Sequence, residues 1–123
     1  MAKRVAVIGA SSDRKKYGNK AVRAFARQGW EVYPVNPHEA EIEGMRVFRS
    51  IGDVPGPLDM VSVYVPPSVG RTLLAAVAAA RPGEVWFNPG SEDDDLLAQA
   101  RALGLDPILA CSITGAGESP SRY

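Results

Sequence analysis

Short apolar segments alternate with helical patterns along most of the chain. Residues 3–9 form a continuous β-branched run, which is typical of a strand buried on both faces. Similar short runs occupy residues 30–35, 58–65, 84–87 and 107–110. Because helix-length segments separate most of these runs, the pattern predicts an α/β fold with a parallel sheet and right-handed crossovers.

Three helices are predicted between the strands. Residues 19–28 form an amphipathic pattern that ends before Gly29, and glycine is typical of the position after a helix. We expect Ser68 to cap a second helix and Ser91 to cap a third that runs to about Leu103. Helices in these positions would cover both faces of the sheet.

The segment between the second and third long strands differs from the others. Residues 41–48 are too short and too interrupted by glycine for a crossover helix, so we expect a turn and a short edge strand near residues 46–48. The prediction is one domain, residues 1–114, with a Rossmann-like doubly wound parallel sheet of order 3-2-1-4-5-6 and a short strand 3. Residues 115–123 are rich in Gly, Ser and Pro and are predicted to form a flexible C-terminal tail.

Composition and charge narrow the possible partners. The 123 residues carry 14 Lys+Arg and 14 Asp+Glu, so the formal net charge is zero. Nucleic acid as the main partner and electrostatic binding to a membrane both need a basic surplus. The apolar runs are also too short for a membrane span or the core of a signal peptide. We therefore expect a cytoplasmic protein, present as a monomer or a weak homodimer.

Residues with turn-forming chemistry follow the predicted strands. Because the carboxyl ends of parallel strands share one rim, and because doubly wound sheets bind ligands there, we expect these residues to border one ligand site. The segments are Gly9-Ala10-Ser11-Ser12, Asn36-Pro37, Tyr64-Val65-Pro66-Pro67, Asn88-Pro89-Gly90 and Cys111.

The first of these loops suits a phosphate. Gly9 permits a sharp turn, and Ser11 and Ser12 add hydroxyls beside free backbone N–H groups at a predicted helix start. Residues 14–16 are all cationic, although each could equally belong to a solvated loop. The acidic residues 92–95 start another helix, where they favour the helix dipole and would repel a phosphate. We therefore expect the anionic end of the ligand at the first loop.

The first loop does not match a dinucleotide fingerprint. A G-x-G-x-x-G motif starting at Gly9 would need glycine where Ser11 and Arg14 stand. The acidic residue that binds ribose at the end of the second strand is also absent, and that position holds Asn36. Both departures disfavour NAD and favour a ligand with several phosphates and no nicotinamide ribose.

No catalytic constellation is visible in the sequence. His38 and Cys111 are the only histidine and cysteine. In the predicted order they follow strands that are separated by four inter-strand spacings. At ~4.8 Å per spacing, the two residues would lie roughly 19 Å apart, which disfavours a Cys–His dyad. A metal site is also disfavoured, because there is no His/Cys cluster. We therefore expect no catalytic residues and no metal site.

Several of these segments together resemble a known family. Residues 5–11, 17–18, 33–37, 64–67 and 85–90 are similar to the CoA-binding domain family. This family comprises small Rossmann-like proteins related to the N-terminal domain of the succinyl-CoA synthetase alpha subunit. The resemblance covers roughly residues 3–112. It implies coenzyme A or acyl-CoA as the ligand, and it implies binding without the ligase chemistry of the synthetase.

The resemblance also implies how CoA would lie along the rim. The phosphates would meet residues 10–14, the adenine and ribose would lie near residues 36–38, and the pantetheine arm would pass Val65 toward Asn88. One departure concerns the thiol end, because Asn88-Pro89-Gly90 replaces a Gln-x-Gly stretch that many relatives carry. The implied site residues are Gly9, Ala10, Ser11, Ser12, Asp13, Arg14, Tyr17, Asn36, Pro37, His38, Tyr64, Val65, Pro66, Asn88 and Gly90.

Three functions stay open at this point. The first is a CoA-binding module without its own catalytic machinery, serving as a carrier, sensor or regulatory protein. The second is a binder of NAD(P) or another nucleotide with the same fold. The third is the CoA-binding subunit of an acyl-CoA ligase whose partner chain supplies catalytic groups. Cys111 is either a small buried hydrophobe or a residue that forms a mixed disulfide with the CoA thiol.

Overall fold

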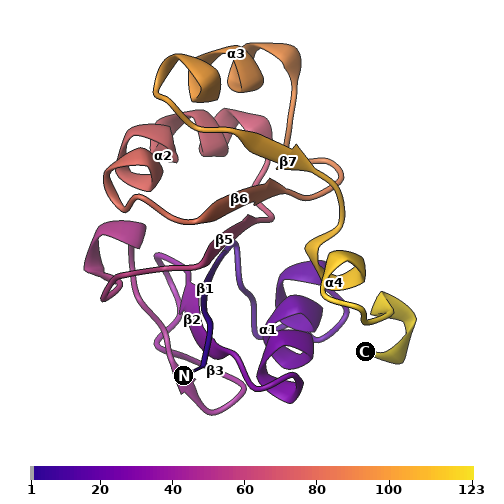
Figure 1. Ribbon diagram of the computed structural model, residues 1–123. Helices are drawn as coiled ribbons and strands as arrows, with labels where there is room; N and C mark the ends of the chain where they lie inside the picture. Colours follow the sequence, from indigo (N-terminus) through magenta and orange to yellow (C-terminus); the bar gives the residue numbers. More distant parts are fainter. Residues whose placement is uncertain (1) are drawn as a thin grey trace.

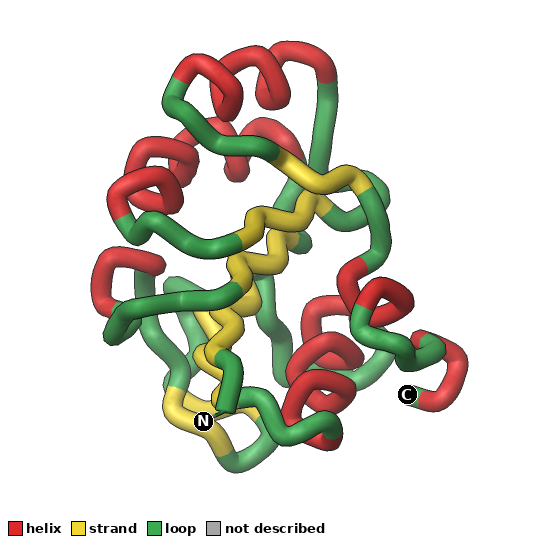
Figure 2. The backbone as a smooth tube through the Cα atoms, viewed as in Figure 1, coloured by secondary structure: helices red, strands yellow, loops and turns green. Residues whose placement is uncertain are grey.

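A parallel sheet with helices on both faces organises the chain, as Figures 1 and 2 show for the computed structural model, which describes residues 2–123. The five strands follow the order β2-β1-β5-β6-β7, and every neighbouring pair is parallel. This order confirms the predicted doubly wound topology. The strands are β1 (Arg4–Ile8), β2 (Glu31–Val35), β5 (Met60–Val63), β6 (Glu84–Phe87) and β7 (Pro107–Leu109).

Helices cover both faces of this sheet. In Figure 1, α2 and α3 lie together on one side of the strands, and α1 and α4 lie on the other. The bounds are α1 (Tyr17–Arg27), α2 (Pro67–Ala79), α3 (Asp94–Ala102) and α4 (Ser112–Gly115), with short 3₁₀ helices η1 (Ile51–Asp53) and η2 (Pro120–Arg122). None of the helices within residues 2–123 is both long and apolar enough to cross a membrane.

The packing of β1 explains why residues 5–8 are all apolar. Successive side chains of a strand point to opposite faces of the sheet. Ala6 and Ile8 belong to the core cluster that includes the buried residues of α2 and α3. Val5 and Val7 belong to the second cluster, which includes Phe25 of α1. Both faces are buried from Val5 to Ile8, so none of these four positions favours a polar residue.

The predicted edge strand is shorter than expected. Val35 and Phe48 form a single parallel bridge, in which the Phe48 N–H donates to the Pro34 carbonyl at 2.9 Å. The residues before it turn back at Gly44, whose φ is +77°, so that β4 (Met45–Arg46) pairs antiparallel with β3 (Glu41–Ile42). Pairing within this hairpin leaves only one residue for the edge of the main sheet.

Two helix starts differ from the prediction. Helix α2 begins at Pro67 with Pro66 as its N-cap, so Ser68 lies inside the first turn. Helix α3 is capped by Asp93, whose carboxylate accepts a hydrogen bond from the Leu96 N–H at 2.8 Å. Ser91 instead donates its hydroxyl to the Asn88 carbonyl at 2.6 Å. This turn delays the start of α3.

Residues 115–123, predicted to form a flexible tail, are placed against α1. The Arg23 guanidinium donates to the Tyr123 carbonyl at 3.0 Å, and the Gln28 side-chain amide donates to the Ala116 carbonyl at 2.7 Å. These bonds bring the segment across α1 toward the carboxyl rim of the sheet. The flexibility of residues 115–123 stays a prediction.

Candidate functional site

A cleft of about 850 Å³ opens where the parallel strands end. Its walls come from the loops after β1, β2, β5 and β6 and from the segment that follows β7. The volume lies within the ~300–1,000 Å³ typical of small-molecule sites. The lining residues are Gly9, Ala10, Ser11, Lys16, Tyr17, Gly18, Asn36, His38, Glu39, Tyr64, Val65, Pro66, Asn88, Pro89, Cys111, Thr114 and Pro120.

Most of the residues implied from the sequence meet at this cleft. Those in its lining are Gly9, Ala10, Ser11, Tyr17, Asn36, His38, Tyr64, Val65, Pro66 and Asn88. The others, Ser12, Asp13, Arg14, Pro37 and Gly90, belong to the same loops but lie outside the lining.

Two glycines bring backbone segments close together at the base of the cleft. Gly9 has a φ of +88°, and a side chain there would lie 3.1 Å from the Tyr64 backbone. At Gly18 a side chain would overlap the Gly9 carbonyl oxygen. Gly18 therefore lets the start of α1 pack directly on the first loop. Gly18 was not among the site residues predicted from the sequence, although its position just before the amphipathic pattern of α1 was a signal.

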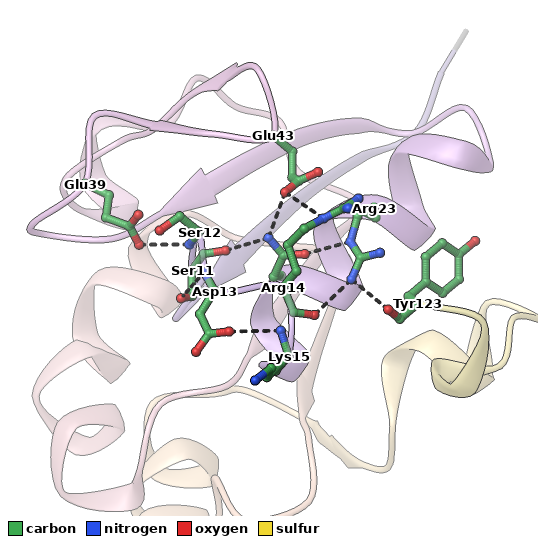
Figure 3. A network of polar contacts seen from close by, with 10 residues as sticks. Ser11, Ser12, Asp13, Arg14, Lys15, Arg23, Glu39, Glu43 and Tyr123 are labelled. Carbon is green, nitrogen blue, oxygen red and sulfur yellow. Dashed lines mark hydrogen bonds and ion pairs between the residues drawn. The ribbon is translucent and has the colours of Figure 1, made fainter.

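The first loop is held by its own polar side chains, as Figure 3 shows. The Ser11 hydroxyl accepts a hydrogen bond from the Asp13 N–H at 3.0 Å, and the Asp13 carboxylate accepts one from the Lys15 N–H at 3.0 Å. Asp13 therefore shapes the turn and does not face the cleft. Arg14 is also directed elsewhere, because its guanidinium lies 3.4 Å from the Glu43 carboxylate. Of the three predicted cations, Lys16 alone lines the cleft.

Backbone donors remain free at this loop. Within residues 2–123, the N–H groups of Ser11, Tyr17 and Gly18 form no hydrogen bond. Tyr17 and Gly18 are the first residues of α1, where the helix dipole favours negative charge. The arrangement can therefore hold an anion, with Lys16 beside it.

Asn36 joins the first and second loops. Its side-chain oxygen accepts a hydrogen bond from the His38 N–H at 2.7 Å, and its side-chain amide donates to the Ala10 carbonyl at 2.8 Å. A residue missed from the sequence lies next to it. Glu39 lines the cleft, and its carboxylate accepts a hydrogen bond from the Ser12 N–H at 3.0 Å. No local pattern indicated Glu39, because its orientation depends on a contact between two loops.

A buried polar network lies beneath the cleft. The Ser62 and Ser112 hydroxyls are 2.7 Å apart, and the Asn88 amide donates to Ser62 at 2.9 Å. The Asn88 carbonyl oxygen accepts a hydrogen bond from the Ser112 N–H at 2.7 Å. The nitrogen and the oxygen of the Asn88 side-chain amide both form hydrogen bonds inside the protein. Asn88 therefore fixes the position of α4 relative to the sheet. Buried polar groups paired in this way favour one defined arrangement.

Tyr64 extends this network to the cleft. Its hydroxyl lies 3.1 Å from the Ser112 hydroxyl. Burial raises the pKa of Tyr64 from 10.0 to about 12, although hydrogen bonds from Ser112 and Ser62 partly oppose the rise. Tyr64 is therefore a neutral phenol near pH 7 and is not suited to act as a base.

His38 and Cys111 stand at opposite ends of the cleft. They follow β2 and β7, the two outer strands of the sheet, so four strand spacings separate them, or roughly 19 Å at ~4.8 Å each. Cys111 lines the cleft and is partly buried against the core cluster that includes Phe25, so both roles considered from the sequence stay predictions. Within residues 2–123, no three His, Cys, Asp or Glu side chains are grouped so that they could hold a metal ion.

The fold and the cleft define a Rossmann-like α/β domain with a pocket at the carboxyl rim of its parallel sheet. The family model described as the CoA binding domain matches residues 3–116. The chain belongs to the CoA-binding domain family.

This chain is similar both to part of a larger protein and to a chain of about its own size. The alpha subunit of the ADP-forming acetate–CoA ligase II of Pyrococcus furiosus is 40% identical over 112 residues, covering 82% of this chain and 24% of that subunit. The chain thus spans about a quarter of that relative. A conserved hypothetical protein of Pyrococcus furiosus has a similar structure, with a TM-score of 0.85, 31% identity and coverage of 94% of this chain and 99% of that one.

A larger enzyme carries the same fold. The apo form of the dinucleotide-forming acetyl-coenzyme A synthetase 1 of Candidatus Korarchaeum cryptofilum matches with a TM-score of 0.74 and 24% identity. The match covers 85% of this chain and 25% of that one.

Proposed function

We propose that this protein binds coenzyme A or acyl-CoA in the rim cleft and serves as a carrier, sensor or regulatory protein without catalytic groups of its own. The observation that carries the proposal is the convergence of the family-matching segments on one cleft. The loops after β1, β2, β5 and β6 all contribute to its lining. Membership of the CoA-binding domain family supports CoA over other ligands that suit the same fold.

The proposed orientation follows the distribution of charge and polarity. The CoA pyrophosphate lies at the first loop, where Ser11 and Gly18 offer free N–H groups and Lys16 adds positive charge. The adenosine lies toward the loop at His38. The pantetheine arm passes Val65 and ends on the side of the cleft formed by Cys111 and its neighbours.

Thermal scans in the presence of six ligands test the proposal. We expect CoA and acetyl-CoA to stabilise the protein, by about 2.7 kcal/mol at a hundredfold excess over Kd. Dephospho-CoA tests the contribution of the 3′-phosphate. NAD, NADP and ADP test the competing nucleotide-binding function. Stabilisation by NADP or ADP without stabilisation by CoA would contradict the proposal.

A second candidate function is the CoA-binding part of an acyl-CoA ligase. The similarity to the acetate–CoA ligase alpha subunit of Pyrococcus furiosus favours it. A partner chain would then supply the catalytic groups. Purification from the native cell tests this candidate, because it predicts a larger co-purifying chain together with CoA ligase activity that the present chain lacks alone.

A further inference from the structure

The Glu39 carboxylate lies against the loop proposed to hold phosphate, as Figure 3 shows. One of its oxygens accepts a hydrogen bond from the Ser12 N–H at 3.0 Å and lies 3.4 Å from the Asn36 side-chain nitrogen. The Glu39 backbone is held by the same asparagine, because its N–H donates to the Asn36 side-chain oxygen at 3.2 Å. The first loop therefore already carries an anion, and that anion is part of the chain.

A carboxylate and a phosphate compete for such a position. Both are anions that accept charge-assisted hydrogen bonds from backbone N–H groups. They also repel each other at short range, so a phosphate cannot bond to the Ser12 N–H while Glu39 keeps it. A phosphorylated ligand that bonds to the Ser12 N–H must displace the Glu39 side chain. One held only by the free Ser11 and Gly18 N–H groups meets the charge of Glu39 at the same loop.

The remaining charges of the cleft do not outweigh this carboxylate. Among the described lining residues, Lys16 is the only Lys or Arg, and Glu39 is the only Asp or Glu. Arg14, the nearby guanidinium, pairs with Glu43 outside the lining. A small anion would therefore meet a cleft with little net attraction. CoA differs because its adenosine and pantetheine groups add contacts elsewhere in the cleft.

We infer that Glu39 is a specificity-determining residue, which occupies the Ser12 N–H and is displaced from it when the CoA pyrophosphate binds. The inference rests on the proposed function. It assigns Glu39 two effects: it weakens the binding of every phosphorylated ligand, and it excludes free phosphates that lack the additional contacts of CoA. Discrimination through a built-in repulsive group is a common means of specificity.

Calorimetric titration of Glu39→Gln tests the inference. The probes are CoA, dephospho-CoA and inorganic pyrophosphate. We expect the variant to bind CoA and dephospho-CoA about tenfold more tightly, since an uncharged side chain is a weaker competitor for the N–H. We also expect measurable binding of pyrophosphate to the variant and none to the wild type. Glu39→Ala removes the competing acceptor altogether and should give at least the same gain.

Glu41→Gln is the matched control. Glu41 is exposed on β3, two residues away, so its replacement makes the same change in charge without freeing the Ser12 N–H. We expect its affinity for CoA to stay within about twofold of the wild-type value, because the charge of an exposed side chain is largely screened by salt. An equal gain in Glu41→Gln and Glu39→Gln would attribute the effect to overall charge and would overturn the inference.

Other outcomes separate this inference from the proposed function. If the wild type binds CoA and both Glu39 variants bind it no more tightly, the inference is wrong and the proposed function stands. A gain with CoA alone would place Glu39 at the 3′-phosphate and overturn the inference in its stated form. If neither the wild type nor the variants bind CoA, the proposed function fails and the inference fails with it. Thermal melting of the ligand-free variants checks that each is folded.

Discussion

Tyr64 illustrates how a correctly predicted cleft residue can have an unexpected role. Its place after β5 was evident from the sequence, because the Tyr-Val-Pro-Pro segment ends a predicted strand. The structure adds that its hydroxyl turns inward to Ser112. Tyr64 therefore both lines the cleft and joins the buried network through its hydroxyl.

The raised pKa of Tyr64 predicts a loss of stability in alkali. The folded protein favours the neutral phenol, so the stabilisation is fully present below pH 10 and is lost as the pH rises toward 12. We expect the free energy of unfolding to fall over this window by about 1–3 kcal/mol more in the wild type than in Tyr64→Phe. Urea denaturation at a series of pH values measures the difference. Equal slopes for the wild type and Tyr64→Phe would refute the prediction.

Ser12 provides a test of where the phosphates lie. Its side chain is exposed, so Ser12→Glu should change the thermal midpoint little, while a carboxylate beside the proposed pyrophosphate should weaken CoA binding at least about tenfold. Isothermal titration measures the affinity. Ala76→Glu, which adds the same charge at an exposed position of α2, should leave it nearly unchanged. An unaltered affinity in Ser12→Glu would mean that the phosphates bind elsewhere.

Helix α1 shows what periodicity predicts and what it leaves open. The amphipathic pattern predicted a helix over residues 19–28, and the structure has Tyr17–Arg27. The earlier start depends on Gly18, which packs against the Gly9 carbonyl. Such a contact involves residues outside the helix, so the apolar period does not indicate it. Helix α3 starts later than predicted for a similar reason. The Ser91 hydroxyl donates to the Asn88 carbonyl, and Asp93 caps the helix instead.

Gly18→Ala is expected to disturb both the helix and the cleft. A methyl group there would overlap the Gly9 carbonyl oxygen, which is backbone and cannot easily move. We expect a loss of about 1–3 kcal/mol in the free energy of unfolding, measured in urea. Gly52→Ala is the control, because the nearest atom to the new side chain, the Ser50 hydroxyl, lies 3.7 Å away. Gly52→Ala should change stability by about 0.5 kcal/mol or less, and a similar value for Gly18→Ala would contradict the proposed packing.

The molecule as a whole depends on contacts between distant segments around the first loop. Arg23 of α1 donates to the Asn19 side-chain oxygen at 2.7 Å and, through a second nitrogen, to the Arg14 and Tyr123 carbonyls at 3.0 Å each. Its guanidinium also lies 5.5 Å from the centre of the Tyr123 ring. One side chain thus joins the first loop, α1 and the C-terminal segment, as Figure 3 shows.

Arg23→Ala should loosen the first loop and the C-terminal segment together. Removal of the guanidinium leaves the Arg14 and Tyr123 carbonyls without this donor, so local opening should become more frequent. We expect faster tryptic cleavage at residues 14–16 and after Arg122, monitored by mass spectrometry under native conditions. Arg27→Ala, at an exposed position in the last turn of α1, should keep the wild-type rate. Faster cleavage at one of the two places alone would show that Arg23 does not couple them.

The amino-acid pattern alone determined the strand order and the rim on which the loops after the strands meet, because β-branched runs and helical periods are local properties with few compatible topologies. It also indicated Gly9, Asn36 and Val65 as cleft residues, since each directly follows a strand. Only the tertiary structure decided which loop side chains face the cleft. Glu39 and Pro120 face it, while Asp13 and Arg14 bond within or beside the first loop. The direction of a loop side chain depends on contacts with segments far away in the chain, and no local pattern records those contacts.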